Sequence, residues 1–238
     1  MPRLTAVTAM PRSRESERVR RIFDRLASRY DRKLGLSERL LFEGGREWVC
    51  SRARGNVLEI SIGTGRNLPL YAADVRITGV DISPGMLDIA RARAAALGRT
   101  AELRLGDAEA LELPDASFDT VVCTLALCSI PDPGAAVAEM RRVLRPGGRV
   151  LLLEHVRSPI RVVRTVQRAL EPITVWLGGD HLVREPLELL ERGGFEVEEL
   201  ERSKLGVVER VAARRAGTHS GAGADGGSDS PVASYSGG

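Results

Sequence analysis

The sequence predicts an α/β fold: a doubly wound, mainly parallel seven-stranded sheet, closed by an antiparallel edge hairpin and preceded by two helices. Helical and strand signals alternate along the chain, and most strand signals are unbroken apolar runs, which is typical of a parallel sheet covered on both faces. The last two strand signals, at residues 195–203 and 206–215, have only a tight turn between them and therefore must pair antiparallel.

Two helices are expected before the sheet. Over residues 14–32, apolar side chains recur with helical spacing. A second helix is predicted over residues 37–53, with Ser37 as its N-cap and with Leu40, Leu41 and Trp48 facing inward.

The rest of the chain supplies the sheet and its covering helices. Parallel strands are expected at residues 56–62, 76–82, 101–107, 118–127 and 149–156. Helices are predicted at residues 67–72, 84–97, 133–144 and 185–194. Between the fifth strand and the last helix, residues 157–184 mix apolar side chains with Arg161, Arg164 and Arg168, which indicates a basic amphipathic helix.

Length and composition limit the classes of protein to which the chain can belong. The chain of 238 residues is 43% hydrophobic and 28% charged, which is ordinary for a globular protein. We expect a flexible N-terminus over residues 1–13, one domain over 14–215 and a disordered Gly/Ser-rich tail over 216–238. Without a long apolar run or a secretory signal, the chain is expected to be cytoplasmic. Three cysteines without a CxxC pair predict neither a disulfide framework nor a metal site.

Small and polar residues gather at the ends of four predicted strands. In a doubly wound sheet, ligands bind beyond the carboxyl ends of the strands, where the strand order reverses. Glycines let the backbone approach a ligand, and an acid after the second strand suits the two hydroxyls of a ribose. The expected cofactor-binding residues are Glu59, Ser61, Gly63, Thr64, Gly65, Asn67, Asp81, Ile82, Met86, Asp107, Ala108 and Thr124.

This ordered set resembles the class I S-adenosylmethionine-dependent methyltransferases, over about residues 20–215. The resemblance is closest to the branch that holds quinone-biosynthesis C-methyltransferases, bacterial phospholipid N-methyltransferases and methyltransferase-like thiol methyltransferases. The stretches that carry it include LEISIGTGRNLPLY (58–71), GVDISPGML (79–87), GDAEAL (106–111), FDTVVCTLALCSIPDP (118–133) and LRPGGRVLLLEHVRSP (144–159).

The resemblance implies a Rossmann-like methyltransferase fold with S-adenosyl-L-methionine as cofactor. It implies that Gly63 and Gly65 pass under the methionine part of the cofactor and that Asp81 holds the ribose. It places Asp107 and Ala108 beside the adenine. Many relatives carry glycine where this chain has Ser61.

The acceptor of the methyl group is expected to be small and apolar or lipid-like, for example quinone-like. The end of the fourth strand lacks the N/D-PP-Y/F-type motif of many methyltransferases that act on RNA or DNA amines, so nucleic acid is not the expected partner. A general base is needed only if the acceptor carries a proton at neutral pH. The expected catalytic residues are His155, His181 and Tyr30.

Residues 157–184 are expected to shape the acceptor site. The amphipathic helix predicts either a lid over an apolar acceptor or peripheral contact with an anionic membrane through residues 157–175, and an ordinary helix on the sheet stays an alternative.

Two other classes of protein stay open. One is an NAD-dependent oxidoreductase, although Leu68 stands where a dinucleotide loop has a third small residue. The other is a methyltransferase-fold protein that only binds membrane or nucleic acid. The acceptor atom and the oligomeric state are not predicted.

Overall fold

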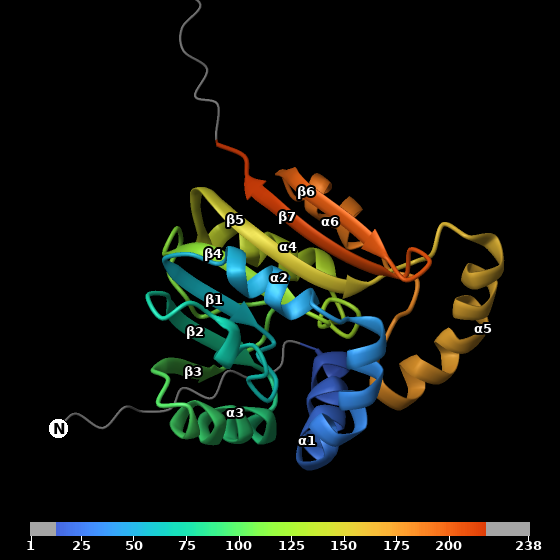
Figure 1. Cartoon of the computed structure of the whole chain (residues 1–238), viewed down its shortest axis with the longest axis horizontal. Coiled ribbons are helices and arrows are strands. Elements are labelled where there is room, and N and C mark those ends of the chain that lie inside the picture. The colour runs from blue at the N-terminus through green and yellow to red at the C-terminus, as the bar shows by residue number, and fades with distance from the viewer. Residues whose placement is uncertain (1–12, 218–238) are drawn as a thin grey trace, which may run out of the picture.

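A computed structural model describes residues 13–217, so the expected flexible ends lie almost entirely outside the described residues. Seven strands form one sheet in the order β3-β2-β1-β4-β5-β7-β6 (Figure 1). The parallel strands are β1 (Asn56–Ile60), β2 (Arg76–Asp81), β3 (Ala101–Leu105), β4 (Phe118–Thr124) and β5 (Leu144–His155). The antiparallel edge is formed by β6 (Phe195–Ser203) and β7 (Val208–Arg215). The predicted fold class is confirmed.

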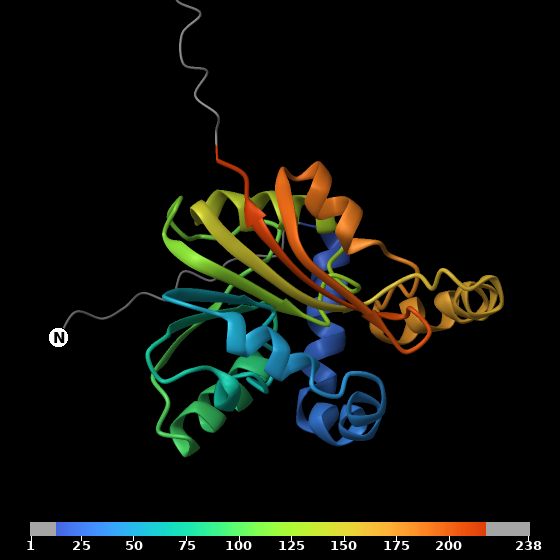
Figure 2. The same ribbon diagram turned by 45° about the horizontal axis from the view of Figure 1, so that its top comes forward.

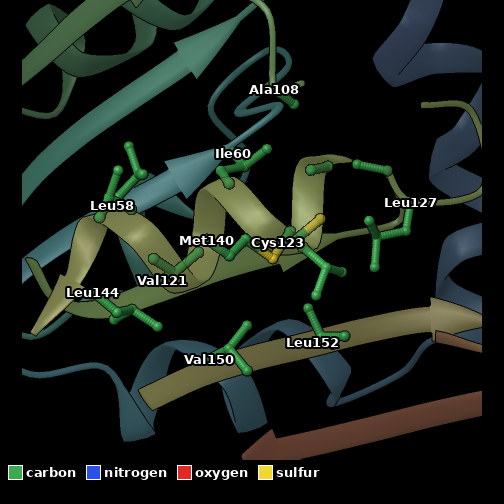
Figure 3. Packing of buried hydrophobic residues seen from close by; sticks show 14 of the residues in the cluster. Leu58, Ile60, Ala108, Val121, Cys123, Leu127, Met140, Leu144, Val150 and Leu152 are labelled. Carbon is green, nitrogen blue, oxygen red and sulfur yellow. The ribbon is translucent and has the colours of Figure 1, made fainter. Parts of the chain in front are cut away.

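Two layers of helices cover the sheet (Figure 2). One face carries α2 (Gly45–Arg52), the 3-10 helix η1 (Leu68–Leu70) and α3 (Pro84–Ala96), and the other carries α4 (Pro133–Val143) and α6 (Pro186–Arg192). Side chains of successive residues in each strand point to opposite faces of the sheet. In β4, for example, Val121 and Cys123 pack toward α4, as Figure 3 shows, whereas Val122 packs toward α2 and α3.

The N-terminal helices differ from the prediction. Helix α1 (Arg14–Leu41) is continuous through Ser37, the expected cap, and Leu41 is exposed rather than inward-facing. The break comes at Gly44, whose φ of 68° ends the turn after α1. Helix α2 starts at Gly45, where glycine allows close packing, since a Cβ would lie 2.8 Å from a methyl group of Leu153. Trp48 is buried, as expected.

Two strands also end or begin away from their predicted limits. The fourth strand stops at Thr124 because Leu125 takes a φ of 54°, which turns the chain out of the sheet. The fifth begins five residues early, at Leu144, which pairs with Phe118 across an irregularity in the register. The three cysteines are buried and free.

Helix α5 (Arg161–Gly178) does not cover the sheet. Figures 1 and 2 show it beside α1, projecting from the edge where the parallel strands end. None of its residues is buried, so the alternative of an ordinary helix packed on the sheet is wrong. None of the helices within residues 13–217 is long and apolar enough to cross a membrane.

Candidate active site

A pocket opens at the carboxyl ends of β1 to β4, where the strand order reverses. Most of the expected cofactor-binding residues line it: Ser61, Gly63, Thr64, Asp81, Ile82, Met86, Asp107, Ala108 and Thr124. Three others lie behind its wall: Glu59, Gly65 and Asn67.

Asp81 ends β2 with its carboxylate held by loop backbone. Its Oδ2 accepts a hydrogen bond from the N–H of Gly63 (2.8 Å), and its Oδ1 accepts one from the N–H of Ser83 (2.9 Å). Burial raises the pKa of Asp81 to about 6, although these two bonds favour the charged form. The carboxylate therefore lines the pocket in a fixed orientation, as a preformed acceptor for ligand hydroxyl groups.

The loop after β1 has three residues in the left-handed region, Ser61 (φ 52°), Gly63 (φ 58°) and Gly65 (φ 76°). Gly63 lines the pocket, and a Cβ there would have free space, so its role is conformational. At Gly65 a Cβ would lie 2.7 Å from Leu68 and 3.3 Å from Ala90, so this glycine lets the loop pack against α3. The conformation of Ser61 is the kind that favours glycine.

Glu59 organises the wall behind the pocket. Its carboxylate accepts hydrogen bonds from Asn67 Nδ2 (2.8 Å) and from the Tyr71 hydroxyl (2.8 Å), and burial raises its pKa to about 7. Arg46 of α2 donates to Asn67 Oδ1 (2.9 Å) and to Thr124 Oγ1 (3.1 Å), and both Arg46 and Thr124 line the pocket. Glu59 therefore acts on the pocket through these partners.

Asp107 and Ala108 follow β3 and close one end of the pocket. Asp107 Oδ1 accepts from the N–H of Glu109 (3.0 Å), which fixes the turn after the strand. A Cβ on Gly106 would lie 2.8 Å from Val80, so glycine allows this turn to approach β2. The structure thus brings these residues together with Asp81, as the sequence predicted.

Helix α1 is fastened over the pocket by two aspartates. Asp24 Oδ1 accepts hydrogen bonds from Ser83 Oγ (2.6 Å) and from the N–H of Gly85 (2.9 Å) at the start of α3. Asp31 accepts from Thr64 Oγ1 (2.7 Å) and pairs with Arg93. The Thr64 side chain therefore ties α1 to the loop after β1.

The pocket is apolar on the side that α1 covers. Val19 and Phe23 of α1 face the segment after β4, which contributes Ile130 and Pro131. Tyr30, an expected catalytic residue, also lines the pocket, and its ring meets Phe23 edge-on with centroids 6.3 Å apart. An apolar wall with one phenol suits a hydrophobic acceptor.

The two histidines expected to be catalytic do not line this pocket. His155 ends β5, one strand beyond the pocket, and burial together with the charge of Arg184 lowers its pKa to about 4. The backbone N–H of His181 donates to Cys128 O (3.0 Å), and its Nδ1 lies 3.4 Å from a carboxylate oxygen of Glu171 in α5. Of the three residues, therefore, only Tyr30 lines the pocket.

Sequence reasoning missed Arg46 and Asp24. Neither belongs to a motif, and both act across elements that are far apart in the chain. It also missed Glu154, a fully buried carboxylate of β5 that accepts from the N–H groups of Ala126 and Leu127 (2.9 Å each). These bonds stabilise the sharp turn at the end of β4. Burial raises the pKa of Glu154 to about 7.

Comparison with known proteins shows to which family this chain belongs. A family model described as a methyltransferase domain matches residues 58–152. Thiol S-methyltransferase TMT1B of Rattus norvegicus is 33% identical over 181 residues, which cover 74% of each chain. The chain belongs to the class I S-adenosylmethionine-dependent methyltransferases. S-adenosyl-L-methionine is its cofactor, which decides against NAD.

Other relatives place the methyltransferase within the expected branch. It is 40% identical to phosphatidylethanolamine N-methyltransferase of Cereibacter sphaeroides over 52% of its own length and 62% of that protein's. It is 38% identical to demethylmenaquinone methyltransferase of Deinococcus radiodurans over 59% of its own length and 61% of that protein's. The methyltransferase thus spans less than two thirds of either relative.

The fold of this methyltransferase is also similar to that of proteins with solved structures. Geranyl diphosphate C-methyltransferase of Streptomyces coelicolor, solved with S-adenosyl-L-homocysteine, has a TM-score of 0.67 and 14% identity, covering 87% of the methyltransferase and all of that chain. The residues lining the pocket suit a molecule such as S-adenosyl-L-homocysteine. Asp81 offers a carboxylate for hydroxyls, Ile82 and Met86 offer apolar contact, and Gly63 keeps the loop free of a side chain.

Proposed function

We propose that this methyltransferase transfers a methyl group to a small apolar or lipid-like acceptor. The observation that carries the proposal is the mixed lining of the pocket. The strand ends contribute the carboxylates of Asp81 and Asp107, and α1 and the segment after β4 contribute apolar side chains, among them Phe23, Ile130 and Pro131. The names of the relatives, which include a phospholipid and a menaquinone precursor as acceptors, point the same way.

Each set of residues has a role in this proposal. Asp81 would accept hydrogen bonds from the ribose hydroxyls of the cofactor, Asp107 would lie beside its adenine, and Gly63 would leave room for its methionine part. Glu59 supports the wall of the pocket through Asn67. When bound, the cofactor supplies a methyl group already activated on a sulfonium. Helix α1 excludes water and holds the acceptor in line, an effect that can contribute roughly 7–11 kcal/mol to lowering the barrier.

Tyr30 is the candidate for contact with the acceptor. Its ring lies in the pocket wall beside Phe23, so its hydroxyl can accept or donate a hydrogen bond to a polar atom of an apolar molecule. Peripheral membrane contact through residues 157–175 would bring lipidic acceptors to the same place.

Phe23→Ala should raise the KM for an apolar acceptor about tenfold, because it removes an aromatic wall while leaving the strand tips intact. Ile22→Ala is the matched control, since Ile22 is also on α1 but does not line the pocket. The measurement uses methyl-labelled cofactor with phosphatidylethanolamine, a demethylated quinol and an alkyl thiol in parallel. Failure of the label to enter any of these three acceptors would contradict the proposed acceptor class.

A further inference from the structure

Helix α5 is attached to the rest of the protein by its polar side. Gln167 Oε1 accepts a hydrogen bond from the N–H of Ser158 (2.9 Å), and its Nε2 donates to the carbonyl of Val156 (2.9 Å). Two turns later, Thr174 Oγ1 donates to the carbonyl of Asp180 (2.7 Å). These bonds fix which side of the helix faces inward.

The apolar side of α5 therefore faces away from the protein. We call it the outer face of α5, and it consists of Val162, Val166, Leu170, Ile173, Trp176 and Leu177. Their spacing of three and four residues places them along one stripe. All are exposed, from 47% for Leu170 to 74% for Val162. A surface helix normally buries such a stripe against its own domain, whereas the apolar stripe of α5 faces solvent.

Positive charge borders this outer face. Arg161 and Arg168 are exposed, and Arg164 is partly covered. Within residues 13–217, none of these three arginines forms an ion pair with a carboxylate. The one acid of α5, Glu171, lies on the inward side, close to His181.

An exposed apolar side chain also stands at the tip of the hairpin between β6 and β7. Leu205 at its tip is 66% exposed, next to Lys204. Ser158 Oγ donates to the carbonyl of Leu205 (2.7 Å), which holds this tip at the start of α5. Two separate elements thus present apolar side chains with neighbouring basic residues.

Helix α5 also lies next to the pocket. Arg18 of α1 donates to the carbonyl of Val175 in α5 (3.1 Å), and a Cβ on Gly179, directly after α5, would lie 3.5 Å from Val19. Val19 is one of the apolar residues of α1 that line the pocket. Whatever binds α5 is therefore close to the acceptor end of the site.

We propose that α5 lies in the surface of an anionic phospholipid bilayer, with its outer face among the acyl chains and Arg161 and Arg168 at the phosphates. A second copy of the chain fits less well, because a two-fold contact through α5 would bring like charges together. Nucleic acid would leave the apolar stripe without a partner. The use of this surface to collect acceptors rests on the proposed function, but the binding itself needs neither cofactor nor acceptor.

Tryptophan fluorescence of the full chain tests the contact directly. The protein has two tryptophans, of which Trp48 is buried and Trp176 is 73% exposed. Vesicles of phosphatidylcholine with a one-third share of phosphatidylglycerol should shift the emission to the blue, and Trp176→Phe should abolish the shift. An emission spectrum that vesicles leave unchanged would overturn the proposal.

Vesicle flotation with variants locates the surface. Val166→Glu combined with Ile173→Glu should weaken binding about tenfold or more, and Arg161→Gln combined with Arg168→Gln should remove the preference for anionic over neutral vesicles. Leu97→Glu, at an equally exposed leucine at the end of α3, should bind like the wild type. Equal flotation of the wild type and the double glutamate variant would overturn the proposal. So would a wild-type dimer in sedimentation velocity that this variant dissociates, since the outer face would then bind a second copy.

Discussion

At the scale of single residues, buried carboxylates shape the candidate site. Burial raises the pKa of Asp81 to about 6 and that of Glu59 and Glu154 to about 7. Each accepts at least two hydrogen bonds, which compensate part of the cost of burying its charge. Of these three carboxylates, only Asp81 lines the pocket. The protonation state of Asp81 can therefore affect the binding of a ligand directly.

Cofactor affinity is expected to fall as the pH drops below 6. Under these conditions the raised pKa of Asp81 leaves its carboxyl protonated in the free protein, so it must release a proton before it accepts from ligand hydroxyls. The Kd for S-adenosylhomocysteine should then rise by up to about tenfold per pH unit, as measured by calorimetry.

Asp81→Asn serves as the control for this titration. It should bind more weakly at neutral pH, and its Kd should lose the part of the pH dependence that Asp81 contributes. If the Kd of this variant follows the same pH curve as that of the wild type, another group controls the binding.

At the scale of elements, α1 is the covering part of the site. Its contacts with α3 and with the loop after β1 are made by Asp24 and Asp31, while Val19, Phe23 and Tyr30 face the pocket. One helix therefore carries both the attachment and the apolar wall. A loss of attachment should weaken ligand binding without disturbing the sheet.

Asp24→Ala should loosen α1, because it removes the acceptor for Ser83 Oγ and for the N–H of Gly85. We expect faster hydrogen–deuterium exchange in residues 14–32 and an S-adenosylhomocysteine affinity lower by about tenfold or less, corresponding to roughly 1 kcal/mol. Asp88→Ala is the matched control, since the Asp88 side chain is 75% exposed in its pair with Arg91. Exchange that is unchanged in α1 would show that Asp24 does not hold the helix.

At the scale of the whole molecule, the pocket joins parts that are distant in the chain. Its lining comes from α1, α2 and the ends of four strands, including the two on either side of the reversal in strand order. A ligand that fills it should therefore stabilise the entire fold rather than one element.

S-adenosylhomocysteine should raise the free energy of unfolding by about 2.7 kcal/mol at a concentration one hundred times its Kd. The measurement is the thermal or denaturant midpoint of the full chain. NAD is the comparison ligand, and it should leave the midpoint unchanged. Stabilisation by NAD alone would be incompatible with the assigned cofactor.

Much of this arrangement was predictable from the sequence. Asp81 and Asp107 could be placed in the pocket because carboxyl ends of adjacent parallel strands meet at one edge of a sheet. A backbone open to a ligand was predicted at Gly63 because a short glycine loop follows a buried strand, and Gly63 lines the pocket. These features depend on order along the chain, which the sequence displays directly.

The positions of the two histidines were less predictable, for a geometric reason. His155 ends a strand of the correct sheet, yet that strand lies beyond the one that closes the pocket. His181 follows α5, whose path could not be derived from the residues within it. Arg46 and Asp24 went unnoticed because they act only through partners that folding brings near.

The sequence by itself determined the fold class, the glycine loop after β1 and the amphipathic character of α5, because periodicity and the order of motifs are local properties. Only the tertiary structure decided that Tyr30 lines the pocket and that the two histidines do not. It also decided the direction of α5. Periodicity shows that a helix has an apolar side, but the hydrogen bonds of Gln167 and Thr174 to the rest of the protein are what turn that side outward.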